Sequence, residues 1–184
     1  MPEYKLAYID THRSERNTFI GGVLVTDSYG LPLEFRHTDA VAPTRIEQIL
    51  YGRALDRYLK AETMARCLLD DLENKPDLLI VPDESYFALT RHYPFPLAQV
   101  GVARRDPLPS HGETLEVSEN EILVQILSMR EPVRVRVDKK NAPTLAAIRS
   151  ILLDAGRTMD VLEPASRVQE ALKHMAQEGA GRQR

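Results

Sequence analysis

Two aspartates stand next to apolar runs, at positions where a carboxylate can bind a metal ion. Asp10 follows the run KLAYI at 5–9, and Asp83 follows the run DLLIV at 77–81 after a single proline. A carboxylate at the tip of a strand is held by a rigid sheet and stays open to solvent. Carboxylate oxygens are ligands that hard divalent cations prefer. The two positions therefore indicate a metal site, although a turn-capping role explains each aspartate as well.

Three glutamates accompany these aspartates. Glu84 directly follows Asp83, and Glu34 lies in an expected hairpin strand. Glu47 stands three residues after Thr44. Because two cations about 4 Å apart need several carboxylate oxygens, these glutamates are candidates to complete the site. Glu47 also has a structural interpretation, since T-x-x-E before an apolar run is a helix capping box.

The apolar patterns predict the elements that position these acids. Three strands come first, at 5–9, 18–26 and 31–38, and a DSYG turn joins the last two into an antiparallel hairpin. Gly21 and Gly22 indicate a bulge or a close backbone approach inside the second strand. A long helix is expected from Thr44 to Asn74, because its apolar residues recur near a 3.6-residue period. Within that helix, Gly52 costs about 1 kcal/mol or marks close packing.

The second half of the chain continues this alternation. A buried strand at 77–81 and another at 97–103 are separated by an irregular aromatic connector that is helical only before Tyr93. After a polar stretch at 104–120, the patterns predict five more elements. These are a segment at 121–129 that is either helix or strand, a strand at 133–138, a helix at 142–156, a short strand at 159–164, and a helix at 166–178 that is capped by Ser166.

The order of elements predicts an α/β protein with a mixed sheet, β-β-β-α-β-α-β, covered by helices and followed by a C-terminal β-α-β-α extension. We expect a core over 1–106, a linker over 107–120, an extension packing on the core over 121–178 and a disordered tail over 179–184.

This order resembles the ribonuclease H-like fold. In that fold the first and fourth strands are neighbours, so the resemblance implies that Asp10 and Asp83 lie side by side. It also implies Mg²⁺- or Mn²⁺-dependent cleavage of nucleic acid, with Asp10, Asp83 and Glu84 as catalytic acids. One cation would activate water and the other would stabilise the leaving oxygen. The expected metal ligands are Asp10, Asp83, Glu47 and Glu34.

Residues 42–105 resemble endonuclease V more narrowly. The sequence has that family's PD, apolar run and aspartate, followed by a segment like P-x-x-GVAK, at Pro76-Asp77, Asp83, Pro96 and Gly101-Val102-Ala103-Arg104. The stretch at 42–52 is similar to the family's proline-led first helix. However, Tyr51-Gly52-Arg53 stands where the family has F-R-E, and Pro82 intervenes before Asp83. No counterpart of the damaged-base wedge motif is visible.

Two hypotheses follow for function. The first is a ribonuclease H-like protein that binds or cleaves nucleic acid with divalent metal held by strand-end carboxylates. The alternative is a catalytically degenerate scaffold that acts as a protein-interaction subunit, in which apolar segments at 121–129 and 142–172 dock a partner or a second copy. Whether the chain is an enzyme is left open by the sequence.

Basic residues around the expected sheet edge have two interpretations. The predicted nucleic-acid contacts are Arg13, Arg16, Arg45, Arg53, Arg104 and Arg105. Ion pairs with nearby acids explain the same arginines. The net charge of -3 excludes a global positive field that would draw in nucleic acid.

Composition bounds the remaining classes. With 184 residues and 43% apolar content, the chain is expected to build one good-sized core. The single Cys67 excludes an internal disulfide, suggests a reducing compartment, and is expected to be an inert core thiol. No apolar run approaches the roughly 20 residues of a membrane span, and the N-terminus lacks signal-peptide features. We therefore expect a cytoplasmic protein with no membrane partner.

Overall fold

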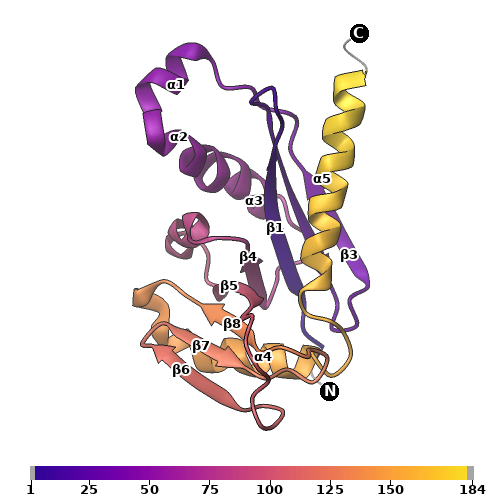
Figure 1. The fold of residues 1–184 in the computed structure, drawn as a ribbon. Helices are drawn as coiled ribbons and strands as arrows, with labels where there is room; N and C mark the ends of the chain where they lie inside the picture. The colour runs from indigo at the N-terminus through magenta and orange to yellow at the C-terminus, as the bar shows by residue number, and fades with distance from the viewer. Residues whose placement is uncertain (1–2, 182–184) are drawn as a thin grey trace.

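One eight-stranded mixed sheet organises residues 3–181, which the computed structural model describes (Figure 1). The strands are β1 (Leu6–Arg13), β2 (Phe19–Thr26), β3 (Pro32–His37), β4 (Leu78–Val81), β5 (Leu97–Val102), β6 (Thr114–Ser118), β7 (Glu121–Val124) and β8 (Val133–Arg136). They lie in the order β3-β2-β1-β4-β5-β8-β7-β6. β4 runs parallel to β1 and β5 parallel to β4, whereas the outer strands pair antiparallel. The expected mixed α/β sheet is therefore confirmed.

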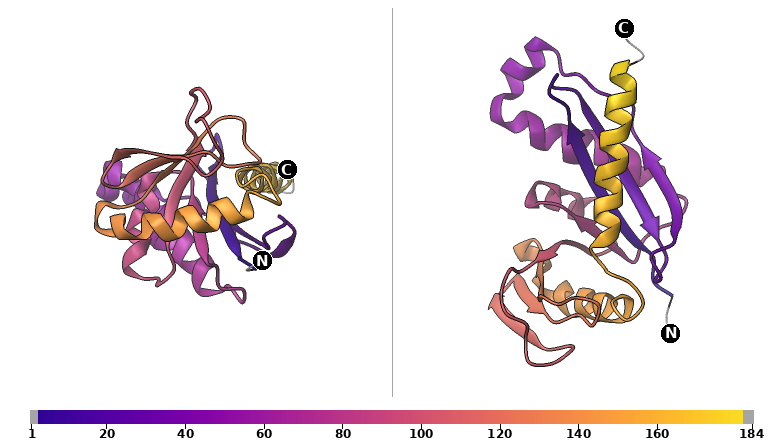
Figure 2. Two further views of the ribbon diagram at one scale, coloured as in Figure 1. Left: turned by 90° about the horizontal axis from the view of Figure 1, so that it is seen from below. Right: turned by 45° about the vertical axis from the view of Figure 1, so that its right-hand side comes forward.

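Gly21 and Gly22 lie in β2 between helical layers on the two faces of the sheet. Helix α5 (Glu163–Gly181) runs along β1 and β2 on one face (Figure 2, right). A Cβ on Gly22 would lie 2.8 Å from Leu172 Cδ2 of α5. On the other face, a Cβ on Gly21 would lie 3.0 Å from Met64 Cβ. The expected close backbone approach is confirmed, because both glycines make room for a helix.

The helix expected from Thr44 to Asn74 is divided at Gly52. It consists of α1 (Arg45–Tyr51), η1 (Gly52–Ala54), α2 (Leu55–Arg57), the π-helical η2 (Tyr58–Ala65) and α3 (Arg66–Asp70). Gly52 has φ 49°, and a Cβ there would meet no atom within 4 Å. The glycine therefore serves the left-handed backbone that ends α1, not close packing.

The apolar residues of α1 face solvent. Ile46, Ile49 and Leu50 are 59%, 61% and 74% exposed, and burial begins only at Leu55. The periodic apolar residues of α1 are therefore not part of the core. Helix α1, which ends at the break at Gly52, projects from the body of the protein (Figure 1).

The C-terminal half extends the same sheet. The stretch expected as a linker at 107–120 contains β6, and the ambiguous 121–129 begins with β7. The helix expected at 142–156 is present as η4 (Lys139–Thr144) followed by α4 (Leu145–Ala155).

The short strand predicted at 159–164 is wrong, and with it the β-α-β-α order of the extension. Asp160 Oδ1 accepts a hydrogen bond from Leu162 N at 2.8 Å, which holds a turn. The last helix then begins at Glu163, so Ser166 lies inside it and does not cap it. Part of the predicted tail, 179–181, belongs to α5, and 182–184 lie outside the described residues.

Two apolar clusters cover the faces of the sheet. One contains Leu6 and Tyr8 of β1 with α4 and α5, and the other contains Ala7 and Ile9 with α3 and η3 (Glu84–Arg91). The segments expected to dock a partner are buried in the first cluster, through residues such as Ile122, Val124, Ile148, Leu152 and Leu172. These side chains pack in the core of the chain itself, whereas Leu127 of the same segments is 63% exposed. Docking of a partner on these segments stays a prediction.

Two further expectations concern single features. Cys67 is exposed, so the prediction of a core thiol is wrong: its position on α3 faces away from the sheet, whereas Leu68 and Leu69 are buried. Within residues 3–181, none of the helices has the length and apolar character needed to cross a membrane.

Candidate functional site

The carboxyl ends of β1, β4 and β5 lie at one edge of the sheet, since the three strands are parallel. Pairing of β1 with β4 ends at Tyr8 and Ile80, but β1 continues to Arg13 by pairing with β2. Asp10 is therefore inside a strand, two residues past the end of the parallel pairing. Asp83 follows β4 directly after Pro82 and caps η3. Both aspartates thus lie at the predicted edge.

Asp10 points toward α5. It lies opposite Gly22 in the antiparallel register, on the face that α5 covers. Its Oδ2 accepts a hydrogen bond from Gln169 Nε2 of α5 at 2.9 Å. Its Oδ1 accepts one from Thr11 N at 2.7 Å. Both carboxylate oxygens therefore have protein donors.

Asp83 is held toward the opposite helical layer. Its Oδ1 accepts hydrogen bonds from Ser85 N at 2.8 Å and from the Ser85 hydroxyl. Its Oδ2 lies 3.6 Å from Lys60 Nζ, which belongs to η2. Asp83 thus serves as an N-cap and ion-pair partner, both ordinary structural roles for aspartate.

Tyr86 lies close enough to both acids to be affected by their charges. It is buried, and its hydroxyl lies 2.9 Å from Thr11 Oγ1. Burial raises the pKa of Tyr86 well above its usual value; the Thr11 hydrogen bond lowers it, and the negative charges of Asp10 and Asp83 raise it. The tyrosine is therefore a neutral hydroxyl within electrostatic reach of both carboxylates.

The other predicted acids have separate environments. Glu84 lies 3.3 Å from Arg136 Nη1. Glu47 and Thr44 form a capping box at the start of α1, as expected. Hydrogen bonds from the Thr44 side chain and backbone lower the pKa of Glu47.

Glu34 lies near the amino ends of the parallel strands, away from Asp10 and Asp83. In the sheet it pairs with Val25, which in turn pairs with Ala7. Its carboxylate accepts hydrogen bonds from Asn74 N at 2.8 Å and from Arg36 Nε at 2.7 Å. Burial alone would raise the pKa of Glu34, but these and other hydrogen bonds outweigh it and lower the pKa to about 2.

A centre for two divalent cations needs several converging carboxylates. Among the described residues, 3–181, no group of three or more His, Cys, Asp or Glu side chains is arranged to hold a metal ion. The side chains that contact Asp10 and Asp83 instead provide a carboxamide, a hydroxyl and an ammonium group. The residues present do not fit a two-cation centre.

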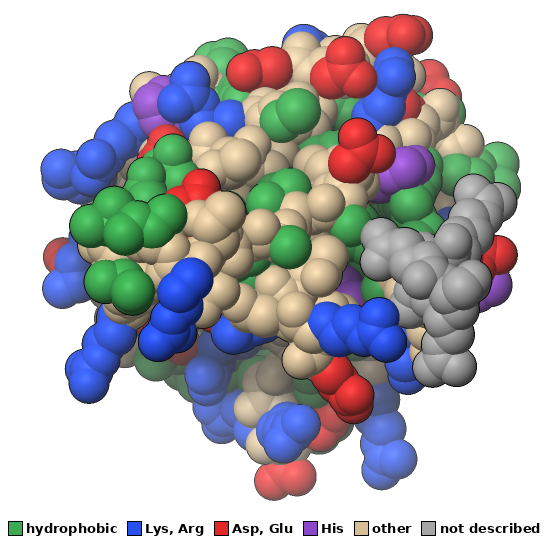
Figure 3. Space-filling model, turned by 90° about the horizontal axis from the view of Figure 1, so that it is seen from above, with side chains coloured by type: hydrophobic (Ala, Val, Ile, Leu, Met, Phe, Trp, Pro, Cys, Tyr) green, Lys and Arg blue, Asp and Glu red, His purple; other side chains and the backbone are tan. Residues whose placement is uncertain are grey.

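The arginines predicted to contact nucleic acid fall at three places. Arg13 and Arg16 line a cavity of about 460 Å³ beside the β1–β2 turn, Arg104 and Arg105 line a broader groove of about 950 Å³ after β5, and Arg45 and Arg53 belong to α1 and η1. At the end of the molecule where α1, the end of β1 and the end of α5 lie, Lys and Arg side chains are interspersed with acidic side chains (Figure 3). The charge here is mixed, in keeping with the small net charge.

Sequence reasoning did not identify Gln169, Lys60 or Tyr86 as parts of this site. One signal was available on the last helix, where Gln169, Lys173 and Gln177 recur every fourth residue and so share one face. The three side chains are exposed, and Gln169 reaches Asp10 of β1 from this face. No local signal marks Lys60 as the partner of Asp83.

Comparisons with solved structures support the fold. The catalytic domain of human endonuclease V is similar to this chain with a TM-score of 0.56 and 12% identity, over 97% of this chain and 84% of that one. Ciona intestinalis endonuclease V, solved with a 24mer DNA containing an inosine followed by a ribo-adenosine, gives a TM-score of 0.55 and 13% identity, over 96% of this chain and 87% of that one. No protein-family model matches the sequence, and no curated protein sequence matches it significantly. The chain therefore shares the ribonuclease H-like fold of endonuclease V, and the resemblance seen at residues 42–105 is confirmed at the level of the fold.

Proposed function

We propose that this protein binds nucleic acid through the arginine-lined groove after β5 and does not cleave it by a two-cation mechanism. The groove carries the proposal. Arg104 and Arg105 follow β5, and Arg130 and Arg134 approach from the turn before β8 and from β8 itself. Of these four arginines, Arg134 alone has an ion-pair partner among the described residues, at 3.3 Å from Glu121. Uncompensated guanidinium groups suit phosphate oxygens.

The position of the groove supports the same proposal. β5 is parallel to β4, so Arg104 and Arg105 extend from the sheet edge that carries Asp10 and Asp83. Arg104 has φ 44°, a left-handed backbone that is uncommon for arginine and redirects the chain after β5. Asp106 and Glu131 also line the groove, so its attraction for phosphate is local.

Fluorescence anisotropy with labelled DNA and RNA oligonucleotides in EDTA tests the proposal. We expect binding that weakens steeply with salt, since each phosphate contact releases counterions. The double variant Arg104→Ala/Arg105→Ala should bind about tenfold more weakly, with a salt slope smaller by about 2. The charge-matched control Arg157→Ala/Lys140→Ala, which alters neither cavity, should bind as the wild type does. Equal losses in both variants, or no binding at all, would contradict the groove.

A metal-dependent nuclease is the second candidate, favoured by the presence of Asp10 and Asp83 at one edge near the Tyr86 hydroxyl. In this candidate Asp10 and Asp83 would hold a single Mg²⁺ or Mn²⁺, and Glu84, which is paired with Arg136, would be a further acid. Incubation of end-labelled oligonucleotides with Mn²⁺, including an inosine-containing DNA, separates the candidates. Cleavage that is lost in Asp10→Asn would favour the nuclease; intact strands with retained binding would favour the first proposal.

A further inference from the structure

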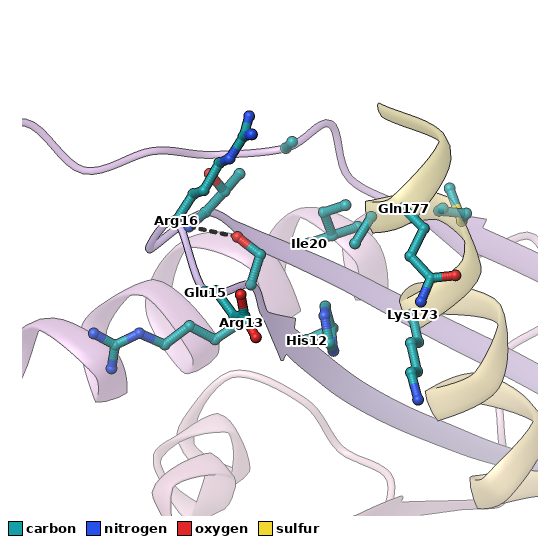
Figure 4. A pocket seen from close by; sticks show the side chains of 12 residues that line it. His12, Arg13, Glu15, Arg16, Ile20, Lys173 and Gln177 are labelled. Carbon is teal, nitrogen blue, oxygen red and sulfur yellow. Dashed lines mark hydrogen bonds between the residues drawn. The ribbon is translucent and has the colours of Figure 1, made fainter. Parts of the chain in front are cut away.

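A second cavity lies between the β1–β2 turn and the C-terminal half of α5, about 460 Å³ in volume (Figure 4). Small-molecule sites typically measure roughly 300–1,000 Å³. His12 from β1 and Lys173 and Gln177 from α5 extend into one region of this cavity, close to Ile20. The cavity is therefore large enough for a small ligand, and it offers both donors and an apolar wall.

The walls of the cavity are fixed by backbone contacts. In the turn, Ser14 N donates to Thr18 O at 2.8 Å and Asn17 N to Ser14 O at 3.0 Å. Asn17 has φ 58°, a left-handed conformation that asparagine tolerates better than most residues. Phe19 and Val41 exchange two hydrogen bonds of 2.8 Å, which hold Ala40 beside the turn. A site built on such contacts is largely formed before a ligand arrives.

The third wall belongs to α5 and is anchored by packing. Leu172 is buried against Gly22 of β2, so the helix approaches the sheet closely next to the cavity. Lys173 follows Leu172 and lies one turn beyond Gln169, the partner of Asp10. His12 lies two residues beyond Asp10 on the same face of β1. The cavity is thus the next step along the interface between β1 and α5 after the Asp10 site.

Lys173 is the cation that faces the region shared by His12 and Gln177, whereas the guanidinium ends of Arg13 and Arg16 extend away from it (Figure 4). Glu15 is the one carboxylate among the lining residues. Arg13 is engaged with Asp56 at 3.3 Å. Among side chains within the described part of the chain, none forms an ion pair with Arg16 or Lys173. Lys173 and the His12 imidazole together provide donors for a phosphate.

We infer that this cavity binds a nucleoside phosphate, with the phosphate at Lys173 and His12 and the base against the apolar wall. Ile20, Ala40 and Ala176 supply that wall, and the Gln177 carboxamide offers both a donor and an acceptor to a base edge. The ligand is either a free nucleotide or the phosphorylated end of a bound strand. In the second case the inference rests on the proposed function, and the cavity holds the strand end while the arginine groove holds its backbone.

Isothermal titration calorimetry with AMP, GMP, UMP, adenosine and inorganic phosphate tests the cavity. We expect at least one nucleotide to bind more tightly than adenosine or phosphate alone, because only a nucleotide contacts both the Lys173–His12 pair and the apolar wall. Lys173→Ala and His12→Ala should each weaken nucleotide binding about tenfold or more, as expected when a charged hydrogen bond is lost. Lys140→Ala removes an exposed lysine outside the cavity and should leave binding unchanged. Thermal unfolding of each variant checks that the fold is retained.

A second arm separates the two sources of the nucleotide. Decanucleotides with a 5′-phosphate, a 3′-phosphate or free hydroxyl ends are compared by anisotropy in wild type and in Lys173→Ala. A strand end in the cavity predicts tighter binding of one phosphorylated form, and loss of that difference in the variant. Equal binding of all three forms, with AMP still bound, assigns the cavity to a free nucleotide.

The inference and the proposed function fail in different ways. The inference of a nucleotide site in the cavity is wrong if no nucleotide binds, or if nucleotide binding is insensitive to Lys173→Ala and His12→Ala. This holds even if oligonucleotides still bind through Arg104 and Arg105. Nucleotide binding that depends on Lys173, without any oligonucleotide binding, overturns the proposed function and supports the cavity as a free-nucleotide site.

Discussion

The carboxylate edge and the neighbouring cavity differ in whether their charged side chains have protein partners. At the edge, Asp10 and Asp83 form hydrogen bonds or an ion pair with Gln169, Thr11, Ser85 and Lys60. In the cavity, Lys173 has no ion-pair partner within the described part of the chain. The carboxylates of the edge already have protein partners, whereas the ammonium group of the cavity, unpaired within residues 3–181, is free to bind an anion.

Helix α5 is what couples these two regions. It supplies Gln169 to the edge, Lys173 to the cavity and Leu172 to the packing between them. The same helix that donates a hydrogen bond to Asp10 therefore also carries the lysine of the proposed anion site. Variants on α5 and on the opposite side of the sheet can separate these contributions.

Truncation of Leu172, which holds α5 against the sheet, should lower stability most and disrupt both the carboxylate edge and the cavity. Leu172→Ala removes a side chain that is 1% exposed and packs on Gly22. We expect the free energy of unfolding to fall by about 2–5 kcal/mol, from lost burial and a residual cavity. Urea titration followed by circular dichroism measures the change. Leu127→Ala, at a position 63% exposed, is the control and should stay within about 0.5 kcal/mol of wild type.

Substitution of Glu34 should have the second largest effect on stability, because its carboxylate accepts more hydrogen bonds than that of Asp10. The pKa of Glu34 is lowered to about 2, and its side chain is 8% exposed. A lowered pKa means that the charged form stabilises the fold above the ordinary glutamate pKa, and that this contribution is lost as pH falls toward 2. We expect it to be worth about 1–2 kcal/mol after solvent screening.

Thermal unfolding between pH 7 and pH 2.5 checks this contribution. Glu34→Gln should be less stable than wild type at neutral pH, and the gap should narrow in acid. Glu116→Gln, at an exposed position of β6, should follow the wild-type curve. A gap for Glu34→Gln that is constant across the pH range would show that the residue acts through packing and not through its charge.

Local patterns were enough to predict most of the sheet, but not the direction of its acids. Strands β1, β2, β4 and β5 follow from short apolar runs bounded by turns, and the Thr44–Glu47 capping box follows from spacing alone. The contact of Asp10 with Gln169 joins residues 159 apart, so no local pattern contains it. Which face Asp10 takes depends on the antiparallel register with Gly22, and that depends on the whole hairpin.

Local chemistry also gives structural roles to two residues that the sequence pattern marks out. Asp83-Glu84-Ser85 is a capping sequence for a short helix, and in the structure the carboxylate of Asp83 is used for that cap. Gly52 was expected to cost helix stability or to permit close packing, but it supplies a positive φ that ends α1. In both cases a nearby backbone requirement explains the residue without any bound ligand.

The smallest predicted change tests what a single amide does at the carboxylate edge. Gln169→Glu replaces the donor 2.9 Å from Asp10 Oδ2 with a second carboxylate. Repulsion between the two should lower stability by about 0.5–1 kcal/mol in EDTA. Because facing carboxylates attract a hard cation, Mn²⁺ should restore the melting temperature of this variant. Gln177→Glu adds the same charge two turns along α5, away from Asp10, and should show no such rescue. If Mn²⁺ stabilised the wild type equally, Asp10 and Asp83 would already hold a cation, and the contrast between the edge and the cavity would disappear.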